Sequence, residues 1–114
     1  MNHMEEMWDF PVVAGVDFPN ANRVHPLMQR RVEKLLRHLR QDENIKKAAL
    51  FGSSLEFRCS SYRDIVLYLE KYEKGKRLEP LPEVGCEVEI ITNLPPESAL
   101  YREIDAKGLL LFER

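Results

Sequence analysis

Two short segments, Leu50-Phe51-Gly52-Ser53-Ser54 and Asp64-Ile65-Val66-Leu67, decide how this chain is expected to fold. The first ends an apolar stretch, residues 48–51, that predicts a buried strand stopping at Gly52. The second begins a strand over residues 64–70, in which side chains alternate as in a strand with one buried face. That alternation predicts one face made of Ile65, Leu67 and Leu69, and an opposite face made of Asp64, Val66, Tyr68 and Glu70.

A helix and a third strand are expected on either side of these two segments. Residues 26–41 follow the helical period, and Pro26 suits a first helical turn. The predicted buried stripe of this helix is Met28, Val32, Leu35, Leu36 and Leu39. Residues 86–92 predict the third strand. Its alternation places Val88 and Ile90 toward the core and Glu87, Glu89 and Ile91 on the other face.

The C-terminal part of the chain predicts one more helix and one more strand. Pro95-Pro96 opens a short helix that runs to about Lys107, and Gly108 supplies its stop. The apolar residues 109–112 then predict a last strand. Together these elements predict an α/β fold, with a small mixed β-sheet and helices packed on one side of it.

The length of 114 residues predicts a single compact domain. We expect an irregular N-terminal arm over residues 1–24 and a folded domain over residues 25–114. The apolar side chains of the arm, Trp8, Phe10, Val12 and Val13, are expected to pack on this domain or on a partner. No apolar run is long enough to cross a bilayer and no signal-peptide pattern begins the chain, so we expect a cytoplasmic protein without membrane contact.

The formal net charge of −2 predicts neither nucleic-acid nor membrane binding, so any charge argument must be local. The most basic region surrounds the first helix and consists of Arg23, Arg30, Arg31, Lys34, Arg37, Arg40, Lys46 and Lys47. Such a face is usually only solvated, although it also suits phosphates or an acidic partner. The two cysteines, Cys59 and Cys86, lack metal-binding spacing and are expected to be free thiols.

The residues with chemical potential lie between the first two strands. A Gly-Ser-Ser turn after a buried strand lets backbone N–H groups and hydroxyls approach phosphate oxygens, although the same tripeptide is common in ordinary turns. Two acidic residues at i and i+2 of a strand point the same way. With a third carboxylate from a neighbouring strand, they hold one or two Mg²⁺ ions that bridge nucleotide phosphates.

The order apolar-Gly-Ser, linker, then Asp-apolar-X-apolar resembles the minimal nucleotidyltransferase family, small members of the DNA polymerase β-like nucleotidyltransferase superfamily. The resemblance covers about residues 26–114 and implies a nucleotidyltransferase (polymerase β palm-like) fold. It implies that Gly52, Ser53 and Ser54 bind the triphosphate of ATP or another NTP. It also implies that Asp64 and Glu89 bind Mg²⁺, with Glu87 as the second choice for the latter position.

Val66 is the main departure from the family pattern, because it stands where the second catalytic Asp is expected. An isopropyl group cannot coordinate Mg²⁺, and Glu70, four residues along the strand at about 13 Å, is too far away to replace it. Two smaller departures are Glu56-Phe57, where Arg-Gly is common, and Arg63, where Ser or Asp often precedes the first Asp.

Several hypotheses follow from the resemblance. One is an enzyme that transfers AMP from ATP to a protein or RNA hydroxyl, as the antitoxin of a toxin–antitoxin pair whose partner is a HEPN-type toxin. A second is an inactive pseudoenzyme that acts as a partner-binding module, and Val66 favours it. Val66 can also be an introduced substitution in an otherwise active enzyme. Nucleic-acid binding through the basic helix face is a further alternative, distinguished by its salt dependence.

Overall fold

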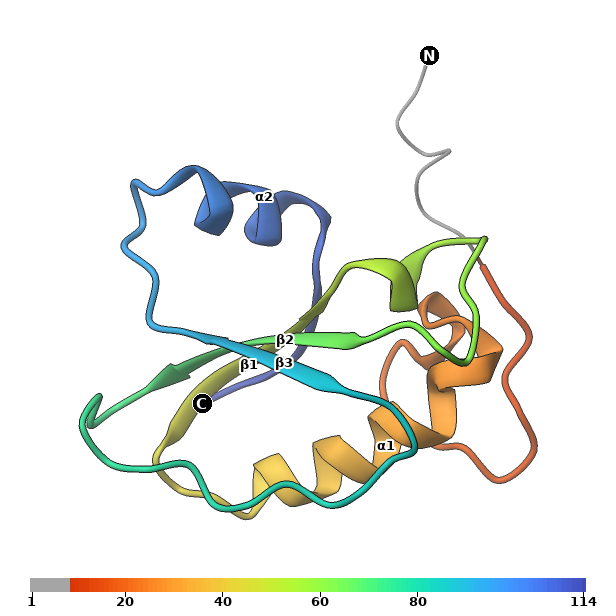
Figure 1. The fold of residues 1–114 in the computed structure, drawn as a ribbon, viewed down its shortest axis with the longest axis horizontal. Helices are drawn as coiled ribbons and strands as arrows, with labels where there is room; N and C mark the ends of the chain where they lie inside the picture. Colours follow the sequence, from red (N-terminus) through yellow and green to blue (C-terminus); the bar gives the residue numbers. More distant parts are fainter. Residues whose placement is uncertain (1–8) are drawn as a thin grey trace.

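A four-stranded mixed sheet forms the centre of the protein (Figure 1). The computed structural model describes residues 9–114. The strands are β1 (Ile45–Phe51), β2 (Ile65–Lys71), β3 (Val88–Thr92) and β4 (Leu109–Glu113), arranged in the order β3-β2-β1-β4. β1 is antiparallel to both β2 and β4, whereas β2 and β3 run parallel. The expected α/β fold with a small mixed sheet is therefore confirmed.

The helix α1 (Pro26–Arg40) covers one face of this sheet and forms the main core with it. Its predicted stripe is buried as expected, since none of those five side chains is more than 2% exposed. The predicted face of β2 is also confirmed, because Ile65, Leu67 and Leu69 all lie in this core. Val88 and Ile90 of β3 pack against the same cluster. Period-2 alternation thus placed the buried sides of β2 and β3 correctly.

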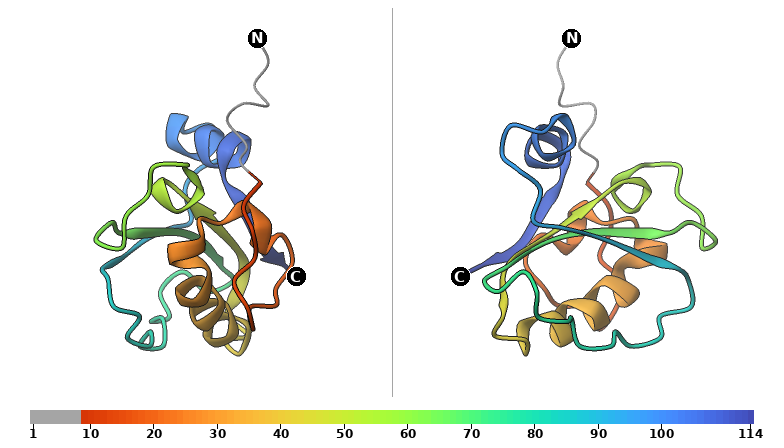
Figure 2. Two further views of the ribbon diagram at one scale, coloured as in Figure 1. Left: turned by 90° about the vertical axis from the view of Figure 1, so that its right-hand side faces the viewer. Right: turned by 60° about the vertical axis from the view of Figure 1, so that its left-hand side comes forward.

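The helix α2 (Ala99–Lys107) lies on the opposite side of the sheet from α1, as Figure 1 and both views of Figure 2 show. The expectation that the helices pack on one side is therefore wrong. Ile104 of α2 forms a second small core with Ala49 and Tyr68, and the ring of Tyr101 meets that of Tyr68 at 5.8 Å. The second face of the sheet is apolar enough that α2 must shield it from water. The polar residues of β2 on this face made it look solvent-exposed in the sequence.

Several element boundaries differ from the sequence expectation. β1 begins at Ile45 rather than residue 48, because the fully buried Ile45 already pairs with Lys71 across the sheet. α2 begins at Ala99 rather than at the two prolines, because the Ser98 hydroxyl caps it by accepting a hydrogen bond from the Tyr101 N–H at 3.0 Å. The helices described between residues 9 and 114 are not long and apolar enough to cross a membrane.

Residues 9–24 are irregular, as expected, apart from a 3-10 turn at Ala21–Arg23. They nevertheless contribute four side chains to the main core: Val16, Phe18, Ala21 and Val24. Of the arm residues expected to pack, Val13 contacts this core and Phe10 meets the His25 ring, while Val12 is 48% exposed. Trp8 lies outside the described residues.

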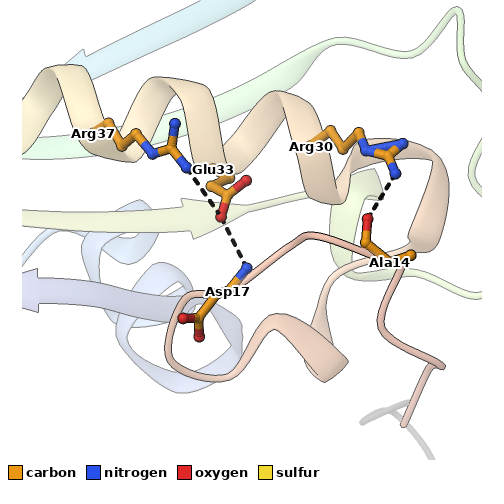
Figure 3. A network of polar contacts seen from close by, with 5 residues as sticks. All are labelled: Ala14, Asp17, Arg30, Glu33 and Arg37. Atoms are coloured by element: carbon orange, nitrogen blue, oxygen red, sulfur yellow. Dashed lines mark hydrogen bonds and ion pairs between the residues drawn. The ribbon is translucent and has the colours of Figure 1, made fainter.

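Basic side chains of α1 hold neighbouring segments against the helix. Figure 3 shows Arg30 donating to the carbonyl of Ala14 at 2.7 Å. Beside it, Glu33 accepts from the Asp17 N–H at 2.8 Å and pairs with Arg37 at 3.7 Å (Figure 3). Two further basic side chains bond to loop carbonyls, Arg31 to Ser61 and Lys34 to Glu83, each at 2.9 Å. These contacts give much of the basic face a structural role.

Gly108 ends α2 as expected, but its physical reason is space rather than a left-handed backbone, since its φ is −77°. A Cβ here would lie 2.5 Å from the Ile104 carbonyl oxygen and 3.1 Å from that of Leu50. We expect Gly108→Ala to lower the free energy of unfolding by about 1–3 kcal/mol, because backbone must shift. Gly75→Ala is the control, since a Cβ there meets nothing within 4 Å. Equal urea midpoints for the two variants would contradict this explanation.

Candidate functional site

A cavity of about 370 Å³ opens where β1 ends and β2 and β3 begin. We call it the β2–β3 cavity, and its lining residues are Ser53, Glu56, Arg63, Asp64, Val66 and Glu89. Four of these six were candidate site residues in the sequence. They come from separate parts of the chain, so their convergence is a property of the fold and not of sequence proximity.

Strand pairing explains why three of these residues meet. Val66 of β2 pairs with Glu89 of parallel β3 on one side and with Phe51 of antiparallel β1 on the other. Asp64 directly precedes β2 and, by alternation, shares the face of Val66. α2 packs over Tyr68 farther along β2, and Val66 near the start of the strand is partly exposed on the same face. The acidic side chains at this open end are accordingly solvent-exposed.

Glu89, rather than Glu87, is the carboxylate that reaches the cavity. Glu87 lies just before β3, where its backbone carbonyl accepts a hydrogen bond from the Ile65 N–H at 3.0 Å. Its side chain is exposed and does not line the β2–β3 cavity. The structure therefore separates two acids that the alternation alone had placed on one face.

Gly52 turns the chain sharply from β1 into the cavity wall. Its backbone has φ 91° and ψ −150°, a conformation that is essentially restricted to glycine. A 3-10 turn, Ser53–Leu55, follows it, with the Leu55 N–H donating to the Gly52 carbonyl at 3.0 Å. A Cβ at Gly52 would lie 3.5 Å from Cγ2 of Val66. The isopropyl group thus sits directly beside the glycine turn.

The two serines after Gly52 have different environments. Ser53 lines the β2–β3 cavity. Ser54 is fully buried and does not line it. Its carbonyl accepts a hydrogen bond from the His25 N–H at 2.8 Å, which ties the turn to the start of α1. The structure brings Ser53 but not Ser54 to the site.

Cys59, in the same linker as Ser53, is only partly exposed. Burial raises the pKa of its thiol, and a hydrogen bond with Ser53 and the nearby charge of Arg63 only partly oppose this effect. The thiol is therefore protonated at neutral pH and is a poor nucleophile. Cys59 and Cys86 are both free, as expected.

Tyr68 lies on the same face of β2 as the residues that line the cavity, but it is buried beneath α2 and does not line the cavity. Its hydroxyl donates to Glu70 at 3.0 Å and accepts from the Leu94 N–H at 3.2 Å. Burial, together with the hydrogen bond and charge of Glu70, raises the pKa of Tyr68 well above its usual range. Tyr68 is thus a neutral structural group, and Glu70 is occupied by it.

The donor set of the cavity fits one Mg²⁺ ion better than two. Asp64 and Glu89, at the starts of β2 and β3, supply two carboxylates, and Glu56 of the linker is a third acid in the lining. Mg²⁺ is commonly held by one or two carboxylates together with substrate phosphates. Between residues 9 and 114, no group of three or more His, Cys, Asp or Glu side chains is placed to hold a metal ion. Val66, which pairs with Glu89 across the sheet, contributes no metal ligand to this lining.

Glu56 and Arg63 also line the cavity, although no repeat in the sequence predicts this. Both were noted only as departures from the family pattern. The signal available was their position in the linker that joins Ser53 to Asp64. No periodicity describes such a linker, so the direction of its side chains is set by tertiary contacts.

The β2–β3 cavity brings several chemically distinct groups together at one end of the sheet. It combines a glycine turn, a serine hydroxyl, three carboxylates (Glu56, Asp64 and Glu89) and one guanidinium. Comparison of the chain with protein-family models, curated proteins and solved structures gives no match.

Proposed function

We propose that this chain is a metal-dependent nucleotidyltransferase of the minimal type, whose catalytic rate is strongly reduced by Val66. Its reaction is the transfer of AMP from ATP to a hydroxyl group of a protein or an RNA. Its biological role is that of an antitoxin acting on a HEPN-type toxin. The supporting observation is the convergence of Ser53, Asp64 and Glu89, three residues of the sequence pattern, around one cavity.

Each residue has a definite task in this proposal. Backbone N–H groups after Gly52 and the Ser53 hydroxyl meet phosphate oxygens, because glycine allows close approach of the chain. Asp64 and Glu89 hold the Mg²⁺ ion. When bound, Mg²⁺ neutralises charge on the phosphates as the nucleotidyl group moves to its acceptor. Val66 contributes no ligand.

Mg²⁺-dependent ATP binding tests this proposal directly. We expect Asp64→Asn and Glu89→Gln each to weaken Mg-ATP binding by about tenfold or more, since each removes a charged ligand of the ion. Glu87→Gln is the matched control, because Glu87 is exposed nearby but outside the cavity. Titration calorimetry with and without Mg²⁺ provides the measurement. Equal affinities for all three variants and the unchanged chain would remove the main support for the proposal.

A second candidate function, a partner-binding module without catalysis, is favoured by Val66 itself. Its side chain packs beside Gly52 and leaves two carboxylates where the family pattern has three. This candidate predicts that the chain binds its protein partner equally well after Asp64→Ala and Glu89→Ala. Pull-down of a HEPN-type toxin, followed by its intact mass, separates the two functions. A mass gain in steps of one nucleotide supports transfer, and unmodified toxin bound by all variants supports the module.

A further inference from the structure

Arg63 is the one cationic side chain among the described residues that line the β2–β3 cavity. Its backbone N–H donates to the Ser60 carbonyl at 3.2 Å, which fixes the turn directly before Asp64. Its side chain is exposed, and no hydrogen bond or ion pair joins its guanidinium to another residue in the part of the chain described, 9–114. The guanidinium is therefore available to a ligand in the cavity.

The charges that line the cavity indicate which kind of ligand the Arg63 guanidinium would bind. Glu56, Asp64 and Glu89 make the lining predominantly acidic, and a triphosphate is also strongly anionic. Such a ligand binds here only if cations lie between the two sets of negative charges. One Mg²⁺ ion at Asp64 and Glu89 supplies part of that charge. The planar fork of Arg63 matches two phosphate oxygens and is the remaining cation at the site.

We infer that Arg63 takes the place of a second metal ion in this cavity. It binds the β- or γ-phosphate of a nucleoside triphosphate that a single Mg²⁺ ion holds at Asp64 and Glu89. This inference rests on the proposed function and names the manner in which its site binds substrate. It explains how a cavity with Val66 in place of a carboxylate still accommodates a Mg-nucleotide.

Binding of Mg-ATP, Mg-tripolyphosphate and AMP, each measured by calorimetry, tests the role of Arg63. We expect Arg63→Gln to weaken binding of Mg-ATP and Mg-tripolyphosphate by about ten- to hundredfold and to leave AMP binding unchanged. The affinity of Arg63→Lys for Mg-ATP should lie between those of the unchanged chain and Arg63→Gln, because lysine keeps the charge but loses the planar guanidinium. Arg58→Gln is the matched control, since Arg58 is exposed in the same linker but does not line the cavity.

Repeating the Arg63→Gln measurement in the Val66→Asp variant distinguishes ligand binding by Arg63 from a purely structural role, because a structural role would give the same loss of affinity in both. With Asp at this position a second metal ion is able to bind, so the effect of Arg63→Gln on Mg-ATP affinity should become several times smaller. If Arg63→Gln weakens Mg-ATP binding equally in the Val66→Asp variant, Arg63 does not take the place of a metal ion.

Two results distinguish this inference from the proposed function. If Arg63→Gln binds Mg-ATP as tightly as the unchanged chain, while Asp64→Asn and Glu89→Gln weaken binding, only the role of Arg63 is overturned. If neither the unchanged chain nor Val66→Asp binds Mg-ATP, the proposed function fails and this inference fails with it.

Discussion

Replacing Val66 with Asp is expected to raise the rate of nucleotide transfer from ATP by about a hundredfold or more. The position lies between Phe51 and Glu89 across the sheet and lines the β2–β3 cavity beside Asp64. A carboxylate there adds a metal ligand where charge develops during transfer, and single groups of this kind typically change rates by about two to three orders of magnitude. Transfer of labelled AMP to a HEPN-type toxin or to RNA measures the change.

Val66→Asn is the matched control for that experiment. It has nearly the size and shape of the Asp side chain but no charge, so we expect it to leave the rate within a few fold of the unchanged chain. The new carboxylate in Val66→Asp also lies among Glu56, Asp64 and Glu89, and repulsion should destabilise the folded protein without metal. Added Mg²⁺ should therefore raise the Tm of Val66→Asp more than that of Val66→Asn. Equal rates and equal Mg²⁺ effects would argue against a catalytic site at this position.

Replacing Gln29 with Leu is expected to lower the free energy of unfolding by about 3 kcal/mol, because buried polar groups of the backbone lose their partner. Gln29 is fully buried within α1. Its side-chain oxygen accepts from the Val13 N–H at 2.7 Å, and its amide donates to Pro11 at 2.9 Å and Val24 at 3.0 Å. One amide thus fixes residues 11–24 against the helix.

Two comparisons make the Gln29 prediction specific. Gln41→Leu is the control, because Gln41 is exposed at the end of α1. Gln29→Glu keeps an acceptor for Val13 but loses both donated hydrogen bonds and buries a charge, so it should destabilise at least as strongly as Leu. Urea unfolding followed by circular dichroism measures all three. If Gln29→Leu lowers the free energy of unfolding no more than Gln41→Leu does, the hydrogen bonds of Gln29 contribute little to stability.

The regular elements were the most predictable part of the fold. Helical spacing identified the buried stripe of α1, and alternation identified which side chains of β2 enter the core. The same alternation placed Asp64 and Val66 on one face, where both line the β2–β3 cavity. The position of α2 was predicted wrongly, because α2 is only nine residues long and its sequence does not indicate which face of the sheet it covers.

The candidate site was predicted only where regular structure carries its residues. Glu89 was preferred over Glu87, and the register of β3 against β2 places it opposite Val66. The sequence pattern does not distinguish Ser53 from Ser54, yet the 3-10 turn directs Ser53 to the cavity and buries Ser54. Such a turn has too few residues to show a period, so the sequence offers no signal for this difference.

By itself, the sequence determined the α/β class and the buried sides of α1, β2 and β3. These properties are local, because the repeat of a helix or strand fixes the direction of each side chain along it. Only the tertiary structure decided that α2 covers the second face, that Gln29 anchors residues 11–24, and that Glu56 and Arg63 join Asp64 in one cavity. These depend on contacts between residues far apart in the chain, which no local repeat encodes.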